Sequence, residues 1–415
     1  MMRHLLTLCI ALLTAHLVSA QANLLTEIAT INLSPTFGIA ISGDYLYANP
    51  GFSDVRIYDI SNPAAPQVLP SVAYGGAFAE QMDVSGNYLY LTGGPTNDLR
   101  IFGLTNPAAP TVLGSVAVPS GGVQFAAHHQ NHSYISAADK LYVVDHNNKN
   151  LPVVLPNPLT VPNAGQFGMR QLAIYGNVLY GALESGVNVY DISNPGQPTL
   201  LTTLPNGAFA LTVDPVQARL FVSQGFGNNG HHVYDISTPS APVPLFSGSG
   251  GTSTPGRLAY SLGLLLQTGP DNLPTQTVNA YTVDNSSSNW QVEHTGSRGF
   301  AVTDIEATDS TFIVAKHGGI EILNGQVVVG TTPGRDSEKL AIWPNPASGA
   351  VHFRTAPSTE RQSLVVRDLV GKTHLHRTVT HSELEWSLTD LAAGLYLVTL
   401  LEDDRPVATQ RLSVR

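Results

Sequence analysis

Cysteine is nearly absent from this sequence, and its scarcity excludes two kinds of chemistry. Among 415 residues there is one cysteine, Cys9, which lies in an apolar stretch near the start of the chain. A disulfide needs two thiols, and no cysteine after residue 9 is present to act as a nucleophile. No Gly-x-Ser-x-Gly motif occurs either, so no sequence motif identifies a catalytic nucleophile, and we predict no catalytic residues.

Charged residues are also scarce, and positive charge is in deficit. Asp, Glu, Lys and Arg make up 12% of the chain, and 20 Lys and Arg face 30 Asp and Glu, for a net charge of −10. Nucleic-acid binding draws on a surplus of cations that displace counterions from phosphates. We therefore expect no nucleic-acid partner.

Long apolar runs are missing except at the N-terminus. Arg3 and His4 precede an apolar stretch from Leu5 to Val18, and Val18-Ser19-Ala20 offers small residues for cleavage before Gln21. This pattern predicts a secretory signal peptide at residues 1–20. No later stretch approaches the roughly 20 apolar residues of a spanning helix, so the chain is predicted not to be membrane-spanning.

Glycine, proline and a repeated phrase are abundant. The chain has 38 Gly and 28 Pro, and one segment recurs as VRIYDISNPAAPQVL from Val55, LRIFGLTNPAAPTVL from Leu99, VNVYDISNPGQPTLL from Val187 and HHVYDISTPSAPVPL from His231. Weaker copies begin at Leu141, Val278 and Ile320. Turn-rich repeats with alternating apolar residues are typical of short β-strands.

The repeat has a period of about 44 residues, and seven copies fill residues 21–330. This period is typical of four-stranded propeller blades, so we predict an all-β fold with a seven-bladed β-propeller. In the first copy, strands are expected at 37–42, 45–49, 55–60 and 67–74. The segment from Leu24 to Leu33 has no blade of its own, and we expect it to close the ring against the last blade, because open strand edges are avoided.

The phrases quoted above resemble the LVIVD-repeat family of bacterial cell-surface propellers, over roughly residues 24–330. The resemblance implies a propeller fold and a location outside the cell. It carries no catalytic residues or cofactor to transfer.

A different pattern follows residue 330. Residues 331–338 are predicted to be a linker, and 339–415 a small β-sandwich of short alternating strands. This part resembles the type A sorting domain of type IX secretion through WPNPASG, VRDLVGK and LAAGLYLV, with motif residues Trp343, Pro344, Asn345, Pro346, Gly371, Gly394 and Tyr396. The resemblance implies the type IX machinery as a partner, and a final place on the outer-membrane surface or in the medium.

Two residue types suggest metal sites without supporting one. Asp59, Asp145, Asp191 and Asp235 share one repeat position, where an Asp commonly accepts backbone N–H bonds from the following turn. His128, His129 and His132, with His231 and His232, include adjacent pairs that point to opposite faces of a strand. We predict neither a metal site nor a cofactor.

Candidate binding residues lie near the starts of the innermost strands, which meet at one mouth of a propeller channel. Phenylalanines occur there at 37, 78, 125, 167, 209 and 300, where inter-blade packing is the simpler explanation. Their polar neighbours form the candidate site: Glu80, Gln81, His128, Arg170, Arg257 and Asp304.

Two functions remain open from the sequence. The first is an exported or cell-surface interaction module that binds a glycan, a protein or a small ligand. The alternative is an exported hydrolase or lyase acting at the channel mouth, which a strongly perturbed carboxylate or histidine there would favour. Enzyme activity is the less expected of the two.

Overall fold

The chain is described by a computed structural model that contains only β-strands and loops within its described part. The described residues are 27–414 apart from 34, 52–53, 75–80, 94–97, 120–124, 166–167, 216, 225–229, 250–256, 262–263, 269–276, 285–290, 300–301, 309–310, 317, 325–339, 344–346, 348, 359–360, 369–372, 380–382, 389–390, 392–393 and 403–404. The predicted all-β fold is confirmed. The predicted signal peptide lies outside the described residues.

The chain divides into two compact units, residues 1–328 and 329–415. In the described part of the first unit, the strands form seven antiparallel sheets, numbered here in chain order. Sheets 1 to 3 comprise β2 (Gly38–Ser42), β3 (Tyr45–Asn49), β4 (Asp54–Asp59) and β5 (Gln67–Ala73); β6 (Gln81–Ser85), β7 (Tyr88–Thr92), β8 (Asp98–Gly103) and β9 (Thr111–Ala117); and β10 (Phe125–His129), β11 (His132–Ala137), β12 (Lys140–Asp145), β13 (Val153–Val154) and β14 (Leu159–Thr160).

The remaining sheets repeat the same order of neighbouring hairpins. Sheets 4 to 7 comprise β15 (Leu172–Tyr175), β16 (Val178–Leu183), β17 (Gly186–Asp191) and β18 (Thr199–Leu204); β19 (Ala210–Asp214), β20 (Arg219–Ser223), β21 (Gly230–Asp235) and β22 (Val243–Ser249); β23 (Leu258–Ser261), β24 (Leu264–Thr268), β25 (Thr277–Asp284) and β26 (Gln291–Gly299); and β27 (Val302–Ala307), β28 (Thr311–Lys316) and β29 (Gly319–Asn324) with β1 (Glu27–Ile31).

The seven sheets form a closed ring. The first strand of each sheet contacts the first strand of the next, from β2 through β6, β10, β15, β19 and β23 to β27, and β27 contacts β2 in turn. The ring is therefore a β-propeller, with these seven inner strands around its axis.

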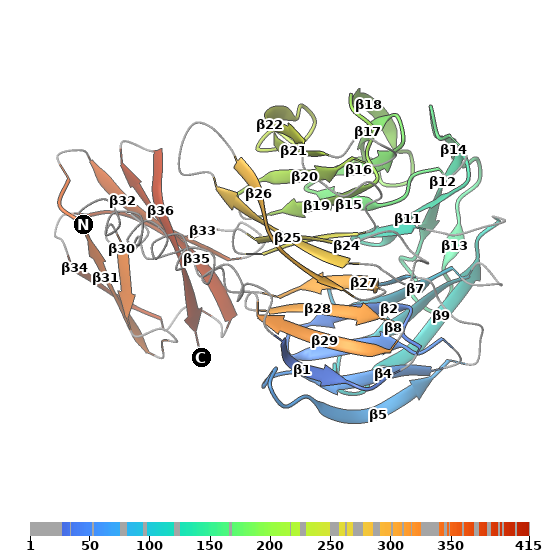
Figure 1. The fold of residues 1–415 in the computed structure, drawn as a ribbon, viewed down its shortest axis with the longest axis horizontal. Helices are drawn as coiled ribbons and strands as arrows, with labels where there is room; N and C mark the ends of the chain where they lie inside the picture. Colours follow the sequence, from blue (N-terminus) through green and yellow to red (C-terminus); the bar gives the residue numbers. More distant parts are fainter. Residues whose placement is uncertain are drawn as a thin grey trace, which may run out of the picture. The chain divides into compact units, whose positions relative to one another are not determined.

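The N-terminal strand closes this ring. β1 pairs antiparallel with β29, with Ile31 opposite Ile320, so the two ends of the propeller sequence share sheet 7. Figure 1 shows the blue β1 beside the orange β29. This pairing confirms the closure predicted for the segment that ends at Leu33.

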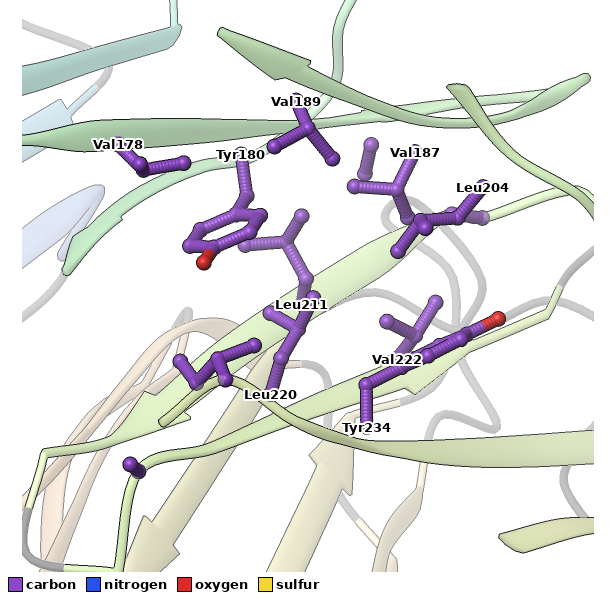
Figure 2. Close-up of a cluster of buried hydrophobic side chains, with 13 residues drawn as sticks. Val178, Tyr180, Val187, Val189, Leu204, Leu211, Leu220, Val222 and Tyr234 are labelled. Carbon is purple, nitrogen blue, oxygen red and sulfur yellow. The ribbon is translucent and has the colours of Figure 1, made fainter. Parts of the chain in front are cut away.

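Neighbouring sheets pack through apolar side chains. Between sheets 4 and 5, Tyr180 and Val189 face Leu220 and Tyr234 across the interface (Figure 2). All four are buried, and each such side chain contributes about 1.5–3 kcal/mol by leaving water. Equivalent positions at most other interfaces are also apolar, so the hydrophobic cores of the propeller lie between its blades.

The second unit contains two sheets that share one apolar core. The strands are β30 (Leu340–Trp343), β31 (Ala350–Thr355) and β34 (Glu383–Ser387) in one sheet, and β33 (Thr373–Thr378), β32 (Gln362–Asp368), β35 (Gly394–Glu402) and β36 (Arg405–Val414) in the other. Phe353 of the first sheet and Val366 and Val398 of the second belong to the same buried cluster. Two sheets packed over a common core form a sandwich.

Candidate functional site

The predicted binding residues lie on the inner strands or just before them, as the repeat predicts. Their surroundings differ from one residue to the next. Glu80 lies outside the described residues, as do the phenylalanines at 78, 167 and 300. The structure describes the other five polar residues. Most of them bridge sheets, and only part of the set converges on the centre of the ring.

Asp304 joins three sheets. Its side chain is 3% exposed, and one carboxyl oxygen lies 3.2 Å from Nε of Arg257, which directly precedes β23 of sheet 6. The other oxygen accepts the Ile39 backbone N–H of sheet 1 at 3.1 Å. A buried carboxylate is stabilised by such partners, so Asp304 connects the last sheet of the ring to both of its neighbours.

Gln81 forms a similar bridge between sheets 2 and 3. Its side-chain carbonyl accepts the Ala126 N–H at 2.8 Å, and its amide donates to the Ala126 carbonyl at 3.2 Å. Gln171 repeats the first of these bonds between sheets 4 and 5, accepting the Leu211 N–H at 3.1 Å. A polar side chain at the start of one inner strand therefore bonds the backbone of the next, at three interfaces of the described ring.

The two arginines meet aromatic rings from other sheets. Arg170 lies 4.2 Å from the centre of the Phe209 ring of the next sheet and bonds Glu184 at 3.2 Å. Arg257 lies 6.0 Å from the centre of the Phe125 ring. Phe125 belongs to sheet 3, which is not adjacent to sheet 6, so this contact crosses the centre of the ring.

Two further carboxyl groups, Asp83 and Glu306, approach this centre and were not predicted. Burial, with a smaller contribution from the Asp304 charge, raises the pKa of Asp83 to about 7, although 39% of its side chain is exposed. Burial and the charges of Asp304 and Asp83 also raise the pKa of Glu306 well above its usual range. Carboxyl groups with raised pKa values are frequent at functional sites.

The sequence contains a signal for both groups, but only when the repeats are compared strand by strand. Asp83 and Glu306 pair with Tyr90 and Ile313 in their hairpins. The equivalent inner-strand positions in sheets 1, 3, 4 and 6 are alanines, at 40, 127, 173 and 259. A carboxyl group at a position where other sheets have alanine indicates that this position has a different role in sheets 2 and 7.

His128 lies between sheets rather than on an open surface. It is 8% exposed, stacks on Tyr90 with ring centres 3.9 Å apart, and has Nδ1 2.7 Å from the Ser133 hydroxyl. Its Nε2 lies 3.9 Å from an Asp83 carboxyl oxygen. His128 therefore faces Asp83 from within the interface between sheets 2 and 3.

The repeated aspartates have the local role that was predicted. Asp59, Asp145, Asp191 and Asp235 each accept the backbone N–H two residues ahead, at 2.8–2.9 Å. They therefore hold the turn before the outermost strand. Within the part of the chain that the structure describes, no group of three or more His, Cys, Asp or Glu side chains could hold a metal ion.

The predicted motif of the C-terminal unit is partly described. Trp343 ends β30, stacks on His352 and carries the Arg354 guanidinium 5.0 Å from its ring centre. Tyr396 is buried in the core, and Gly394 pairs with Val414. Pro344, Asn345, Pro346 and Gly371 lie outside the described residues.

Comparison with protein families accounts for both units. The model of the secretion system C-terminal sorting domain matches residues 341–415, and the LVIVD repeat model matches residues 36–73, 76–118 and 169–204. The chain therefore contains LVIVD repeats and a C-terminal sorting domain. Each matched LVIVD repeat spans one whole sheet, namely sheets 1, 2 and 4. The sorting domain directs the chain through the type IX secretion system, to the cell surface or into the medium.

Solved structures support the fold alone. The chain is 14% identical to the computationally designed Ika8 protein, with a TM-score of 0.50 over 72% of this chain and 99% of that one. It is 16% identical to a protein from Lactobacillus plantarum, with a TM-score of 0.51 over 64% and 88%. Raptor from Chaetomium thermophilum is 10% identical, with a TM-score of 0.56 over 76% of this chain and 30% of that one.

Comparison with curated proteins gives no match. In the described ranges of the chain, no helix has the length and apolar character that a membrane crossing requires.

Proposed function

We propose that the propeller is a ligand-binding module that works outside the cell, and that its ligand is held where the inner strands begin. The observation that carries this proposal is the approach of Arg257 to the Phe125 ring across the centre of the ring. A few convergent polar groups beside an aromatic side chain are the usual composition of a binding site.

The groups at this centre favour a glycan as the ligand. The Arg257 guanidinium and the carboxyl groups of Asp83 and Glu306 can form hydrogen bonds with sugar hydroxyls. The Phe125 ring can pack against the apolar face of a sugar. A protein or a small exported ligand are the other outcomes that a binding experiment can return.

A binding assay with matched variants tests the proposal. The full-length exported protein would be applied to a panel of glycans, together with Phe125→Leu and Arg257→Gln. The control is Arg56→Gln, because Arg56 also bonds an aspartate, at 2.8 Å, but its side chain is 45% exposed in sheet 1. We expect Arg257→Gln to bind at least about tenfold more weakly, as the loss of one charge-assisted bond predicts. Phe125→Leu should also bind more weakly, because the aromatic packing surface is lost, and the control should bind normally.

Two results would contradict the proposal. Glycan binding that survives both site variants would place the ligand elsewhere on the protein. Absence of binding to every glycan of the panel would refute the ligand class.

A specific observation also favours the second candidate function, an exported hydrolase or lyase. The carboxyl groups of Asp83 and Glu306 have raised pKa values, which is how a carboxylic acid becomes a proton donor near neutral pH. Product release from a bound glycan would be measured for the wild type, Asp83→Asn and Glu306→Gln. Turnover lost in both variants with binding retained would favour the enzyme.

We also propose the division of the chain that the sequence predicts: a signal peptide at 1–20, the propeller at 21–330, a linker at 331–338 and the sorting domain at 339–415. The Val18-Ser19-Ala20 site supports cleavage before Gln21. N-terminal sequencing of the exported protein is expected to begin at Gln21. A start beyond Leu24 would remove part of the closing segment and contradict this processing.

A further inference from the structure

The interface between sheets 2 and 3 is polar at positions that are apolar elsewhere in the ring. His128 pairs with Ser133 in the first hairpin of sheet 3. The same pair of positions holds Ile41 and Leu46, Val84 and Leu89, Ile174 and Leu179, and Val213 and Leu220 in sheets 1, 2, 4 and 5. In Figure 2, Leu220 shows the apolar side chain that Ser133 replaces.

Two more positions of sheet 3 depart in the same way. The His146 N–H bonds the Asn131 carbonyl, and the residues that form this same backbone bond in other sheets are Ile60, Leu104, Ile192 and Ile236. Lys149 stands at the turn position of Pro63, Pro107, Pro195 and Pro239. Asp83 is the fifth replacement, at a position where other sheets have alanine. All five residues lie at the interface between sheets 2 and 3.

These side chains form one continuous chain of contacts. The Lys149 Nζ lies 2.9 Å from His146 Nδ1, and His146 Nε2 lies 2.9 Å from the Ser133 hydroxyl. That hydroxyl lies 2.7 Å from His128 Nδ1, and His128 Nε2 faces Asp83 at 3.9 Å. Ser133 and His146 have no exposed surface, and His128 and Lys149 are 8% exposed.

The Lys149 ammonium group, which can only donate, sets the direction of the donors in this chain. Lys149 donates to the Asn131 side chain, the His146 carbonyl and His146 Nδ1, which uses all three protons of its ammonium group. His146 must then carry its proton on Nε2 and donate to Ser133. With the Ser133 proton used within the chain, Ser133 donates to His128 Nδ1, and His128 has Nε2–H toward Asp83. A proton added to His146 would place Nδ1–H against the Lys149 ammonium group, and one added to His128 would remove the acceptor of the Ser133 hydroxyl.

The charged and titratable groups around the histidines do not compensate for an added proton. From sheet 2, Asp83 faces His128, the Tyr90 ring covers it, and the Tyr88 ring lies 4.6 Å from Lys149 Nζ. From sheet 3, Lys149 and His132 act on His146, Asp145 and His129 act on His132, and Asp145 also acts on Lys149. Asp83 is the anion nearest His128, and its pKa of about 7 means that its own charge is lost as the pH falls.

The largest physical causes act in the same direction on the two imidazoles. Burial holds the pKa of His128 well below its usual range, and the charge that His146 would carry adds to this. Burial and the neighbouring Lys149 charge lower the pKa of His146 to about 4. Both imidazoles are therefore neutral in the closed interface.

We propose that the interface between sheets 2 and 3 is an acid-sensitive seam in the propeller, closed while His128 and His146 are neutral and opened when protons enter its hydrogen-bond chain. Asp83 lies at the inner end of this seam, so its opening moves a carboxyl group of the candidate binding site. The seam itself does not depend on which ligand binds there.

A variant that restores the repeat tests the seam. His128→Val, Ser133→Leu, His146→Ile and Lys149→Pro would be combined, each residue being one that other sheets carry. The matched control is His231→Val, because His231 is also buried between sheets and has its pKa lowered to about 4, mainly by burial, but bonds the neutral amide of Gln267. Hydrogen exchange in β10 to β12 would be measured at pH 7 and pH 4.5.

The expected result follows from the sign of the pKa shifts. A histidine whose folded pKa is lowered contributes stability above pH 6.5, and this stability is lost as the pH falls toward the folded pKa. For each histidine, the equilibrium constant for opening rises by up to about tenfold per pH unit over this range. We expect acid to lower the protection factors of β10 to β12, which are corrected for the pH dependence of intrinsic exchange, in the wild type and in His231→Val. The restored variant should keep its protection factors at pH 4.5, and their loss there would overturn the proposal.

A second measurement on the wild type keeps the proposal testable if the restored variant does not fold. Nitrogen-15 NMR of the histidine rings at pH 7 should show His128 and His146 as neutral Nε2–H tautomers. A His146 ring protonated on Nδ1 at neutral pH would break the chain at Lys149 and overturn the proposal.

Discussion

At the scale of single residues, one residue type has three roles that are set by its place in the blade. Asp59 and Asp191 bond a backbone N–H two residues ahead, so their role is local. Asp304 joins sheets that are far apart in sequence, and Asp83 faces a histidine of the next sheet. The local role was predicted from the repeat alone, because a turn contains its own partners. The other two depend on which sheets are neighbours.

Removal of the Asp304 carboxylate should measurably lower the stability of the propeller. Asp304→Ala leaves the Ile39 N–H without this acceptor and the Arg257 guanidinium without its carboxylate, which should lower the free energy of unfolding by about 2–4 kcal/mol. Asp191→Ala, the control, removes an exposed turn bond and should have a much smaller effect. Urea unfolding of both variants decides this. Equal losses would mean that Asp304 does not join the sheets.

The Asp83 carboxyl group should make stability depend on pH in the opposite sense to the histidines. Its folded pKa is raised, so its contribution is present below the unfolded value near 3.8 and is lost as the pH rises through about 7. Asp83→Asn should therefore be stabilised relative to the wild type at pH 8, and by less at pH 5. Thermal melts at the two pH values test this. A difference that grows toward pH 5 would contradict the raised pKa.

At the scale of strands and sheets, hairpins were predicted closely and irregularities were not. The expected strand at 45–49 coincides with β3, and the expected strand at 37–42 begins one residue before β2. Alternation and the Ser42-Gly43-Asp44 turn fix these ends, and Gly43 has a positive φ of 55° that suits glycine. The register shifts between third and fourth strands, such as that between Ile101 and Phe102, have no signal in the alternation.

β1, which closes the ring, should contribute more to the stability of the propeller than the whole second unit does. Deleting residues 27–33 removes the strand paired with β29 and uncovers the buried Ile320 and Ile322, whereas deleting residues 331–415 removes the separate C-terminal unit. We expect the first deletion to lower the Tm of the propeller by about 10 °C or more, and the second to change it little. Thermal melts with equal shifts would contradict the closure.

At the scale of the whole molecule, the sequence determines the architecture more fully than the site. A period of about 44 residues predicted the propeller because every blade buries its apolar faces against its neighbours. Glu80, Gln81, His128, Arg170, Arg257 and Asp304 were chosen by their place in the repeat. The contact between Arg257 and Phe125 across the ring depends on how the ring closes and where the side chains point. The repeat pattern predicts neither. Asp83 and Glu306 were missed because the repeats were compared for their similarities.

The central claim is that the propeller works outside the cell and that the C-terminal sandwich is a separable address for export. The most direct test fuses residues 338–415 to an unrelated periplasmic reporter in a host with type IX secretion, and measures reporter on the surface and in the medium. In parallel, the protein without these residues is followed in the same host. We expect exported reporter and a folded propeller retained in the periplasm. A reporter that stays wholly periplasmic would contradict it.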